Sequence, residues 1–172
     1  MVLSDLEDGS SVFIDANIFI YHFSKESKLN SDCSNFLERV EEGKINGFTS
    51  VAVIQEVTHR MMILEAVTFI PEMKGKDPVK NLKAHPDVVK KLVRHQRIPA
   101  QMALFNISII SPDIDTIERS QQMKRRYGVL SNDALSLQII EDLKINNLVS
   151  NDSDFERVNF ITLYKPSVIA IH

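Results

Sequence analysis

The sequence predicts an α/β fold, with a doubly wound, mostly parallel sheet of four to five strands and helices on both faces. Two observations predict this architecture. Short apolar runs alternate with longer segments whose apolar residues recur at helical spacing. Strands separated by helices in this way are typical of a parallel sheet covered on both sides. The chain of 172 residues is also long enough to bury a core as one domain.

The amino-terminal part of the chain predicts two strands and three helices. The first strand is short, β-branched and aromatic, which is typical of a buried strand. Gly43 ends the second helix, and Ser50 is a good N-cap for the third, whose apolar residues form one stripe. A polar connector over 24–31 separates the first two helices. The elements are a strand over 12–14, helices over 17–23 and 33–42, a strand over 45–49 and a helix over 51–69.

Residues 71–106 interrupt this alternation. Eight basic and two acidic residues lie between 74 and 97, which gives this stretch a charge of +6 in a chain whose net charge is −3. Four apolar residues there indicate an amphipathic helix, which Pro99 should break. We interpret 71–106 as a helical insertion or lid within a single domain spanning 1–172, because it is too short to bury a core of its own. The four apolar residues are Val88, Val89, Leu92 and Val93.

The carboxyl-terminal part returns to the alternation of strands and helices. Gly128 should stop the first of its helices, which ends in a basic run. The second helix is apolar on both sides, which is typical of a buried helix. The elements are a strand over 107–111, helices over 114–127 and 131–143, and strands over 148–149 and 160–164.

Carboxylates occur at four places where a strand has just ended or a helix is beginning. In a parallel sheet these places lie at one edge. Carboxylates about 4–6 Å apart resist joint ionisation, so folding alone gives no reason to gather them, whereas a divalent cation would resolve the repulsion. Ligand sets made only of oxygen favour Mg²⁺ or Mn²⁺. The acids are Asp15, Glu56 and Asp133, and the pair Asp152 and Asp154.

Each acid taken alone also has a structural interpretation. A short polar side chain at a helix start can cap the helix, an acid in the first turn interacts with the helix dipole, and aspartates form turns. An acid on a helix can also simply be solvated. Capping applies to Asp15 or Asn17, and the helix dipole to Asp133. Turn formation applies to Asp152 and Asp154, and solvation to Glu56.

Several other classes of protein are disfavoured. Cys33 is the only cysteine, so no internal disulfide can form, and the five histidines show no paired ligand spacing for zinc. The sequence has no nucleophile elbow, glycine-rich phosphate loop or dinucleotide fingerprint. It also has no apolar run long enough to span a membrane and no basic start of a secretory signal. We therefore expect a cytoplasmic protein.

Four pieces of the sequence, in this order and spacing, resemble the PIN (PilT N-terminus) domain, a nuclease family that includes the VapC-type toxins. The resemblance covers residues 11–160. It implies a doubly wound parallel sheet, an acidic Mg²⁺ or Mn²⁺ pocket, and ribonuclease activity on single-stranded or structured RNA. The pieces are Phe13-Ile14-Asp15-Ala16-Asn17, Thr49-Ser50 with Glu56, Asp133-Ala134, and Ser150-Asn151-Asp152-Ser153-Asp154-Phe155.

Carried over position by position, the resemblance implies a set of site residues. The catalytic acids are Asp15, Glu56, Asp133 and Asp152, of which Asp15, Asp133 and Asp152 are metal ligands. The supporting polar residues are Asn17, Ser150 and Asp154. The chain departs from compact members of the family in its long segment from about 65 to 106, which leaves open whether it is a toxin or an RNA-processing enzyme.

An acidic pocket repels RNA, so cations must be supplied nearby. We expect basic residues of the 74–97 segment and of the basic run to border the pocket and contact phosphates. The expected partners are an RNA substrate, an antitoxin protein and a second copy of the chain in a homodimer or higher homo-oligomer, without a membrane. The candidate RNA contacts are Lys90, Lys91, Arg94, Lys124, Arg125 and Arg126.

Two other functions remain open. One is a catalytically inactive PIN-like module that binds RNA or a protein. The other is a Mg²⁺-dependent phosphatase that uses Asp15 as phosphoryl acceptor. That chemistry usually needs a second acid two residues later, where this chain has Asn17.

Overall fold

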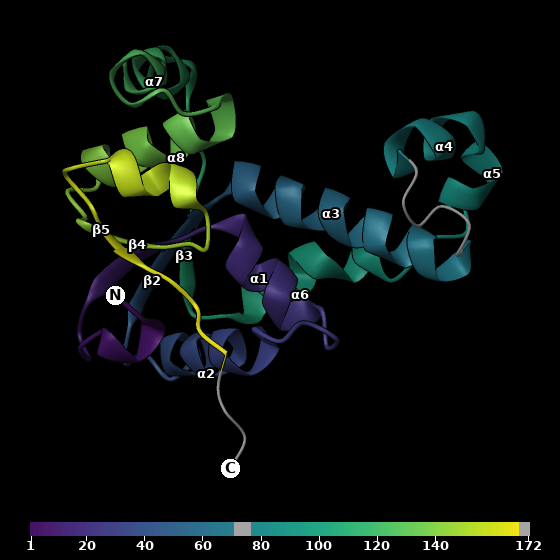
Figure 1. The fold of residues 1–172 in the computed structure, drawn as a ribbon, viewed down its shortest axis with the longest axis horizontal. Helices are drawn as coiled ribbons and strands as arrows, with labels where there is room; N and C mark the ends of the chain where they lie inside the picture. Colours follow the sequence, from purple (N-terminus) through teal and green to yellow (C-terminus); the bar gives the residue numbers. More distant parts are fainter. Residues whose placement is uncertain (71–76, 169–172) are drawn as a thin grey trace.

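The structure is a computed structural model that describes residues 1–70 and 77–168. Within these residues five parallel strands form one sheet in the order β3-β2-β1-β4-β5. Helices α7 and α8 lie on one face of the sheet and α1 and α2 on the other (Figure 1), which confirms the predicted fold class. The strands are β1 (Ser11–Ile14), β2 (Asn46–Ser50), β3 (Ile107–Ile110), β4 (Asn147–Val149) and β5 (Thr162–Tyr164).

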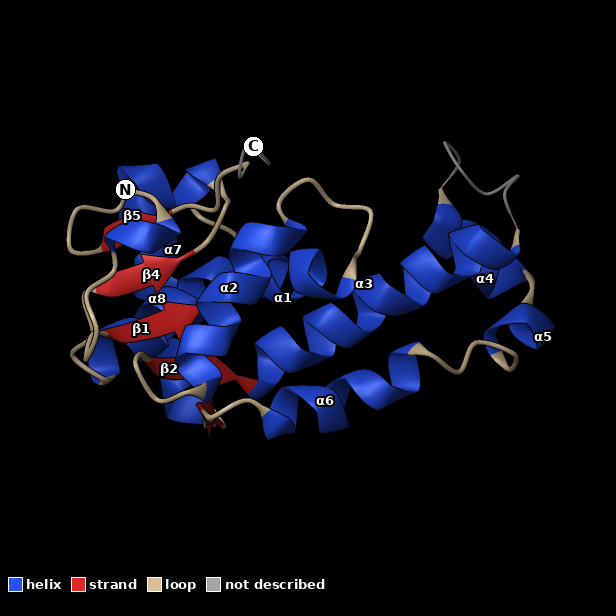
Figure 2. Cartoon of the chain, turned by 90° about the horizontal axis from the view of Figure 1, so that it is seen from below, coloured by secondary structure: helices blue, strands red, loops and turns tan. Residues whose placement is uncertain are grey.

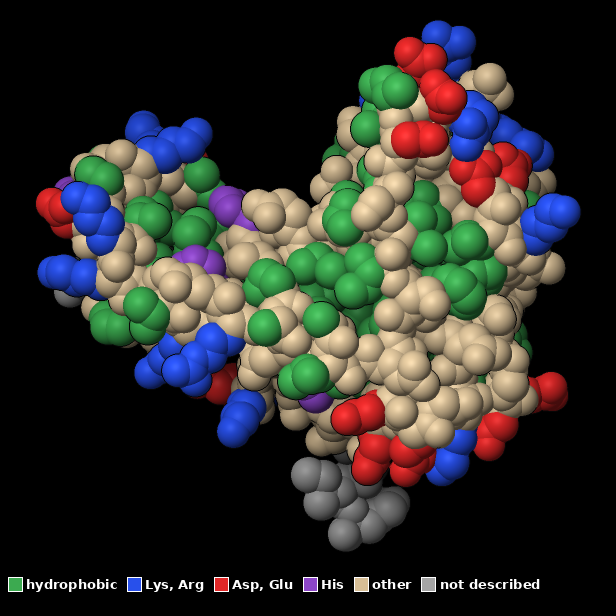
Figure 3. All heavy atoms as spheres, turned by 180° about the vertical axis from the view of Figure 1, so that it is seen from behind, with side chains coloured by type: hydrophobic (Ala, Val, Ile, Leu, Met, Phe, Trp, Pro, Cys, Tyr) green, Lys and Arg blue, Asp and Glu red, His purple; other side chains and the backbone are tan. Residues whose placement is uncertain are grey.

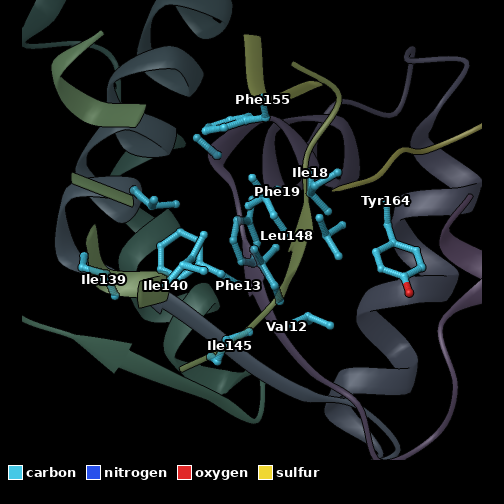
Figure 4. Packing of buried hydrophobic residues seen from close by; sticks show 14 of the residues in the cluster. Val12, Phe13, Ile18, Phe19, Ile139, Ile140, Ile145, Leu148, Phe155 and Tyr164 are labelled. Atoms are coloured by element: carbon cyan, nitrogen blue, oxygen red, sulfur yellow. The ribbon is translucent and has the colours of Figure 1, made fainter. Parts of the chain in front are cut away.

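The central strand β1 fixes the position of everything that follows it. Val12, Phe13 and Ile14 have no exposed surface, because helices cover both faces of the sheet at this strand. Phe13 and Leu148 from neighbouring strands lie among apolar side chains of the helices, including Phe19 and Ile140 (Figure 4). This packing holds the carboxyl end of β1 rigidly, and Asp15 is the next residue.

The helices that flank the sheet agree closely with the predicted ones. Gly128 follows α7 with φ +66, in the left-handed region that glycine favours, and so ends that helix as predicted. Helix α8 is buried on both sides, since Leu137, Ile139 and Ile140 are all buried. The helices are α1 (Ala16–Phe23), α2 (Asn30–Glu41), α7 (Ile114–Tyr127) and α8 (Ser131–Asp142), with short 3₁₀ turns η1 (Leu3–Asp5) and η4 (Ser153–Arg157).

Helix α3 (Val51–Phe69) runs outward from the sheet and carries a small helical unit at its far end (Figures 1 and 2). We call residues 77–97 the arm. It contains α4 (Pro78–Ala84), α5 (Pro86–Val89) and the turn η3 (His95–Arg97). Leu82 and Leu92 of the arm are buried against Ala66 of α3, so the arm has a small core that it shares with this helix. Residues 71–76 of the predicted insertion lie outside the described residues.

The predicted amphipathic helix that Pro99 should break is wrong. Helix α5 ends at Val89, and Pro99 lies in the first turn of a new helix, α6 (Ile98–Leu104), which runs back along α3 (Figure 2). Proline is tolerated at that position because its missing N–H would have no partner in the first turn. Ile98 and Met102 of α6 belong to the main core, so only the arm stands apart from it.

Two smaller findings complete the fold. Helix α2 begins at Asn30, so the end of the predicted polar connector is helical. Of the helices in the described part of the chain, none combines the length and the apolar character needed to cross a membrane.

Candidate acidic active site

Asp15 lies at the junction between the central strand and the first helix. It is the N-cap of α1, and its Oδ1 accepts a hydrogen bond of 2.7 Å from the N–H of Ala16. Strand β4 pairs with β1 so that Ile14 is level with Val149, and the Asp15 N–H donates to the Val149 carbonyl at 3.1 Å. Ser150 therefore emerges beside Asp15, as expected for residues that follow adjacent parallel strands.

A polar network holds the Asp15 carboxylate in place. The Ser150 hydroxyl donates to Oδ2 of Asp15 at 2.6 Å, and Nδ2 of Asn17 donates to the same oxygen at 2.6 Å. Nδ2 of Asn17 also reaches the Ser150 Oγ at 2.9 Å, and the Asn17 Oδ1 accepts from the N–H of Asn151 at 3.0 Å. Asn17 and Ser150, predicted as supporting polar residues, are thus in contact with Asp15.

The other acids surround this network from three further elements. Asp133 lies in the first turn of α8, and Glu56 lies on α3, where its Oε2 accepts from Nδ2 of Asn132 at 3.1 Å. Asp152 caps η4 and accepts from the N–H of Asp154 at 2.8 Å. Asp15, Glu56 and Asp152 lie on segments that follow the carboxyl ends of β1, β2 and β4, and Asp133 lies in the first turn of α8, which follows α7.

The acids perturb one another electrostatically. The pKa of Asp15 is raised to about 6, chiefly by burial and also by the charges of Glu56 and Asp133, against the hydrogen bonds from Ser150 and Ala16, which lower it. We call the neighbourhood of these acids the acidic pocket. Burial and these charges together disfavour the ionised form of Asp15 relative to that of an exposed aspartate.

Asp133 shows the same behaviour from the α8 side of the pocket. The pKa of Asp133 is raised to about 6, chiefly by burial and next by the nearby charge of Asp152. Glu56 and Asp154 raise it as well, while a backbone hydrogen bond at Leu130 lowers it. The structure therefore brings all five predicted acids within electrostatic reach of the pocket.

Asp154 differs from the other four acids because it has a basic partner. Arg157, three residues later, donates to its Oδ1 and forms an ion pair. This pairing offsets the negative charge of Asp154, so we regard it as a weaker candidate for a metal ligand.

The kind of donor in the pocket fits a hard divalent cation. The pocket offers carboxylate oxygens and the Ser150 hydroxyl, and a bound cation would favour the ionised form of Asp15 and Asp133. In residues 1–70 and 77–168, however, no three Asp, Glu, His or Cys side chains are placed closely enough to hold one ion. The acids are gathered at one place but are not closed around a single point.

The basic run at the end of α7 lies near the pocket. Nζ of Lys124 donates to the Ser131 Oγ at 3.1 Å, two residues before Asp133. Arg125 is exposed, and the Arg126 guanidinium lies 5.0 Å from the centre of the Tyr127 ring. Of the three, Lys124 thus has a contact at the start of α8, the helix that carries Asp133.

The other candidate RNA contacts lie farther away than expected. Lys90, Lys91 and Arg94 belong to the arm, which does not border the acidic pocket. The reason is the length of α3, which continues for thirteen residues after Glu56 and so extends about 20 Å beyond it, at roughly 1.5 Å per residue.

Two residues near the pocket, Asn132 and Tyr21, were missed in the sequence analysis. Asn132 holds Glu56, and its place directly before Asp133 in the first turn of α8 was a signal that could have identified it. Asn151 donates to the Tyr21 Oη at 3.0 Å and so ties the β4 end to α1. The sequence contained no signal for Tyr21, because its apolar neighbours made it an ordinary core residue.

A separate cleft of about 1240 Å³ lies on the other side of α3. None of the predicted acids lines it. Side chains from the end of α1, the outer half of α3 and the end of the arm line it, among them His22, Phe23, Leu64, Glu65, Arg94 and Arg97.

Comparison with protein families matches residues 12–161 to the PIN domain. Ribonuclease VapC2 of Methanocaldococcus jannaschii is 29% identical over 157 residues, which cover 91% of this chain and 94% of that protein. Ribonuclease VapC6 of the same organism is 23% identical over 156 residues, which cover 91% of this chain and 97% of the relative.

Solved structures share the fold at low sequence identity. VapBC2 of Rickettsia felis, solved with a promoter DNA fragment, has a TM-score of 0.55 at 16% identity and covers 91% of this chain and 99% of its own. A toxin–antitoxin complex from Klebsiella pneumoniae has a TM-score of 0.54 at 20% identity, and the match covers 88% of this chain and 96% of that one. VapC20 of Mycobacterium tuberculosis is described as a toxin that cleaves the Sarcin-Ricin loop. It has a TM-score of 0.58 at 14% identity, and the match covers 87% of this chain and 96% of that one.

Proposed function

Because this chain belongs to the PIN domain family, we propose that it is a Mg²⁺- or Mn²⁺-dependent ribonuclease that hydrolyses RNA phosphodiester bonds in the acidic pocket. The observation that carries the proposal is the gathering of acids from four elements around Asp15. Two of them, Asp15 and Asp133, have a pKa raised to about 6. Such a cluster opposes folding unless a cation occupies it, which gives it the character of a functional site.

In this proposal each acid has a defined role. Asp15, Asp133 and Asp152 would hold the cation, directly or through water, and Glu56, held by Asn132, would complete the pocket and orient water. Ser150 and Asn17 keep one oxygen of Asp15 fixed through two hydrogen bonds of 2.6 Å. When bound, the ion would lower the pKa of water and stabilise the negative charge on the phosphate.

The names of the relatives support an RNA substrate and a protein partner. Two curated relatives are named ribonucleases, and two structural neighbours are a VapBC2 assembly and a toxin–antitoxin complex. We extend these properties to this chain as a proposal, in which an antitoxin protein binds it and controls its activity. The chain would then act as a toxin.

A homodimer is a further part of the proposal. The outer strand β3 and the adjoining helix α7 expose several apolar side chains, which a second copy could cover. These side chains are Ile109, Ile114 and Ile117.

The proposal is tested by cleavage of a mixed-sequence RNA with and without Mn²⁺. We expect Asp15→Asn and Asp133→Asn each to lower the rate by about 100-fold or more, since loss of metal-site groups has effects of at least this order. Asp142→Asn is the matched control, because Asp142 lies on α8 with Asp133 but is paired with Arg119 at its far end. Equal rates for wild type and either pocket variant would contradict the proposal.

The two alternative functions give different results in the same preparation. An inactive RNA-binding module would bind the RNA without cutting it at any metal concentration. A phosphatase would release phosphate from a small phosphomonoester and leave the RNA intact.

A further inference from the structure

The arm concentrates positive charge in a chain that is otherwise acidic. Six basic and two acidic residues lie within 77–97, so the arm carries +4, and the rest of the chain carries −7 to give the net −3. All six basic side chains are exposed, and within the described residues only Lys90 forms an ion pair, to Asp87 at 3.0 Å. The six are Lys80, Lys83, Lys90, Lys91, Arg94 and Arg97.

The arm is held firmly on α3 rather than attached by a loose connection. The Glu65 side chain, only 3% exposed, accepts hydrogen bonds from the N–H groups of Val93 at 2.9 Å, Arg94 at 2.9 Å and His95 at 3.0 Å. The His95 ring Nδ1 lies 3.0 Å from the same carboxylate. We call this arrangement the Glu65 clasp, and together with the small core of Leu82 and Leu92 it fixes the position of the basic residues.

Helix α3 joins the acidic pocket to the arm core, since Glu56 lies near its start and Ala66 of the arm core lies near its end. At about 100° per residue, Ile63 and Val67, which pack against the arm core, lie within about 20° of Glu56 around the helix, and Ala66 lies about 80° away. Glu65 lies on the side of the helix opposite Glu56, so the arm contacts α3 both through its core and through the clasp.

The space between the arm and the pocket is open. Figure 3 shows the arm, rimmed by lysine and arginine side chains, and the α7–α8 layer rising on either side of a hollow. Helix α8, which carries Asp133 in its first turn, lies at one side of this hollow, and the arm forms its other wall. A polyanion that reaches the pocket thus meets the basic run of α7 at one side and can meet the arm at the other.

We propose that the arm is a second RNA-binding surface, which holds the phosphate backbone of the substrate about 20 Å away from the bond that is cut. At roughly 3.4 Å per phosphate along a stacked strand, this distance corresponds to about six nucleotides. The chain therefore selects RNA that continues at least this far beyond the cleavage site. This inference rests on the proposed ribonuclease function, and it assigns to the Glu65 clasp the role of positioning the arm.

The first test compares the binding of two RNAs that share one cleavage site. One is a hexanucleotide, and the other extends the same sequence by about ten nucleotides on each side, beyond the span estimated above. Both are bound to protein that carries Asp15→Asn, so that the RNA stays intact. The test variant is Lys80→Gln with Lys83→Gln, and the control is Lys44→Gln with Lys144→Gln, which removes equal charge at the amino ends of the strands.

We expect the arm variant to bind the extended RNA about tenfold more weakly. The slope of the logarithm of its affinity against the logarithm of salt concentration should fall in magnitude by about one to two. Its affinity for the hexanucleotide and both affinities of the control variant should stay unchanged. An equal loss of affinity for both RNAs would show that the variant affects the pocket or the fold. An unchanged affinity for both would show that the arm does not bind RNA. Both results overturn the inference.

The second test uses Glu65→Gln to separate position from charge. This variant removes one negative charge from the region, so attraction alone would strengthen the binding of extended RNA. If the clasp positions the arm, binding of extended RNA weakens while binding of the hexanucleotide, which reports an intact pocket, is retained. Tighter binding of the extended RNA would contradict the positioning role.

The two proposals can fail separately. If wild-type protein cuts neither RNA with Mn²⁺ but still prefers the extended one through Lys80 and Lys83, the ribonuclease proposal fails and the arm surface stands. If it cuts both equally well and the arm variant changes nothing, the arm proposal fails alone.

Discussion

Asp15 and Glu65 are both carboxylates shielded from solvent, yet the pKa of Asp15 is raised to about 6 while that of Glu65 is lowered to about 2. Burial tends to raise the pKa of each. At Glu65, three backbone N–H groups and the His95 ring outweigh burial. At Asp15, the hydrogen bonds from Ser150 and Ala16 do not outweigh burial and the charges of neighbouring acids.

The difference separates a structural acid from a functional one. Glu65 has donors for its charge within the chain, so its ionised form stabilises the fold and needs nothing further. The acids of the pocket repel one another and lack such compensation, so their ionised forms favour a cation from outside. Opposite effects on stability should therefore follow when a charge is removed from each region.

The largest expected effect on stability comes from Glu65→Gln. Because the folded pKa is about 2 against an ordinary value of 4.5, the carboxylate contributes about 3 kcal/mol. That contribution is fully present above pH 4.5 and is lost as the pH falls through 2. Urea unfolding at pH 7 should show a loss of about this size, and the difference between variant and wild type should shrink near pH 2. The exposed Glu41→Gln should change the free energy of unfolding by less than about 0.5 kcal/mol.

Asp133→Asn should act in the opposite direction when no metal is added. The folded pKa of Asp133 is raised from 3.8 to about 6, so the stability linked to its protonation is present below pH 3.8 and lost as the pH rises through 6. Above pH 7 the asparagine variant should be more stable than wild type by about 1–2 kcal/mol, after allowance for solvent screening. Urea unfolding in a chelator measures this, with Asp142→Asn as control. A less stable variant would remove the contrast between the two regions.

Ser150→Ala should have the smallest effect on stability and a larger one on activity. The buried hydroxyl donates to Asp15 and accepts from the N–H of Asp152 at 3.0 Å, so its loss should cost about 1 kcal/mol. Because it orients Asp15, the rate of RNA cleavage should fall by about 10–100-fold. Ser153→Ala, at an exposed position of η4, should leave both unchanged. A Ser150→Ala protein with wild-type activity would show that Asp15 needs no such orientation.

The sequence contained enough information for the sheet and for the positions of the acids. Strand β1 is apolar from Val12 to Ile14 because it is covered on both faces there, and this pattern does not depend on distant contacts. Parallel strand ends lie at one edge of a sheet, so the meeting of Asp15, which follows β1, and Ser150, which follows β4, could be expected from the sequence.

The arm could not be predicted in the same way. Glu65 binds the N–H groups of residues 28 to 30 positions later, and every residue but proline has such a group, so no pattern marks the partner. Pro99 was equally ambiguous, because a proline both interrupts a helix and begins one. Which of the two applies is decided here by the packing of Ile98 and Met102 against the main core.

The most direct test of the acidic pocket as a cation site is thermal unfolding at pH 8 with and without Mn²⁺, for wild type and Asp133→Asn. At Mn²⁺ about 100 times its dissociation constant, the wild-type Tm should rise by about 5–10 °C, and that of the variant should change little. The variant should thus be the more stable protein without the ion and the less stable one with it. An unchanged wild-type Tm, or equal shifts of both proteins, would contradict the account.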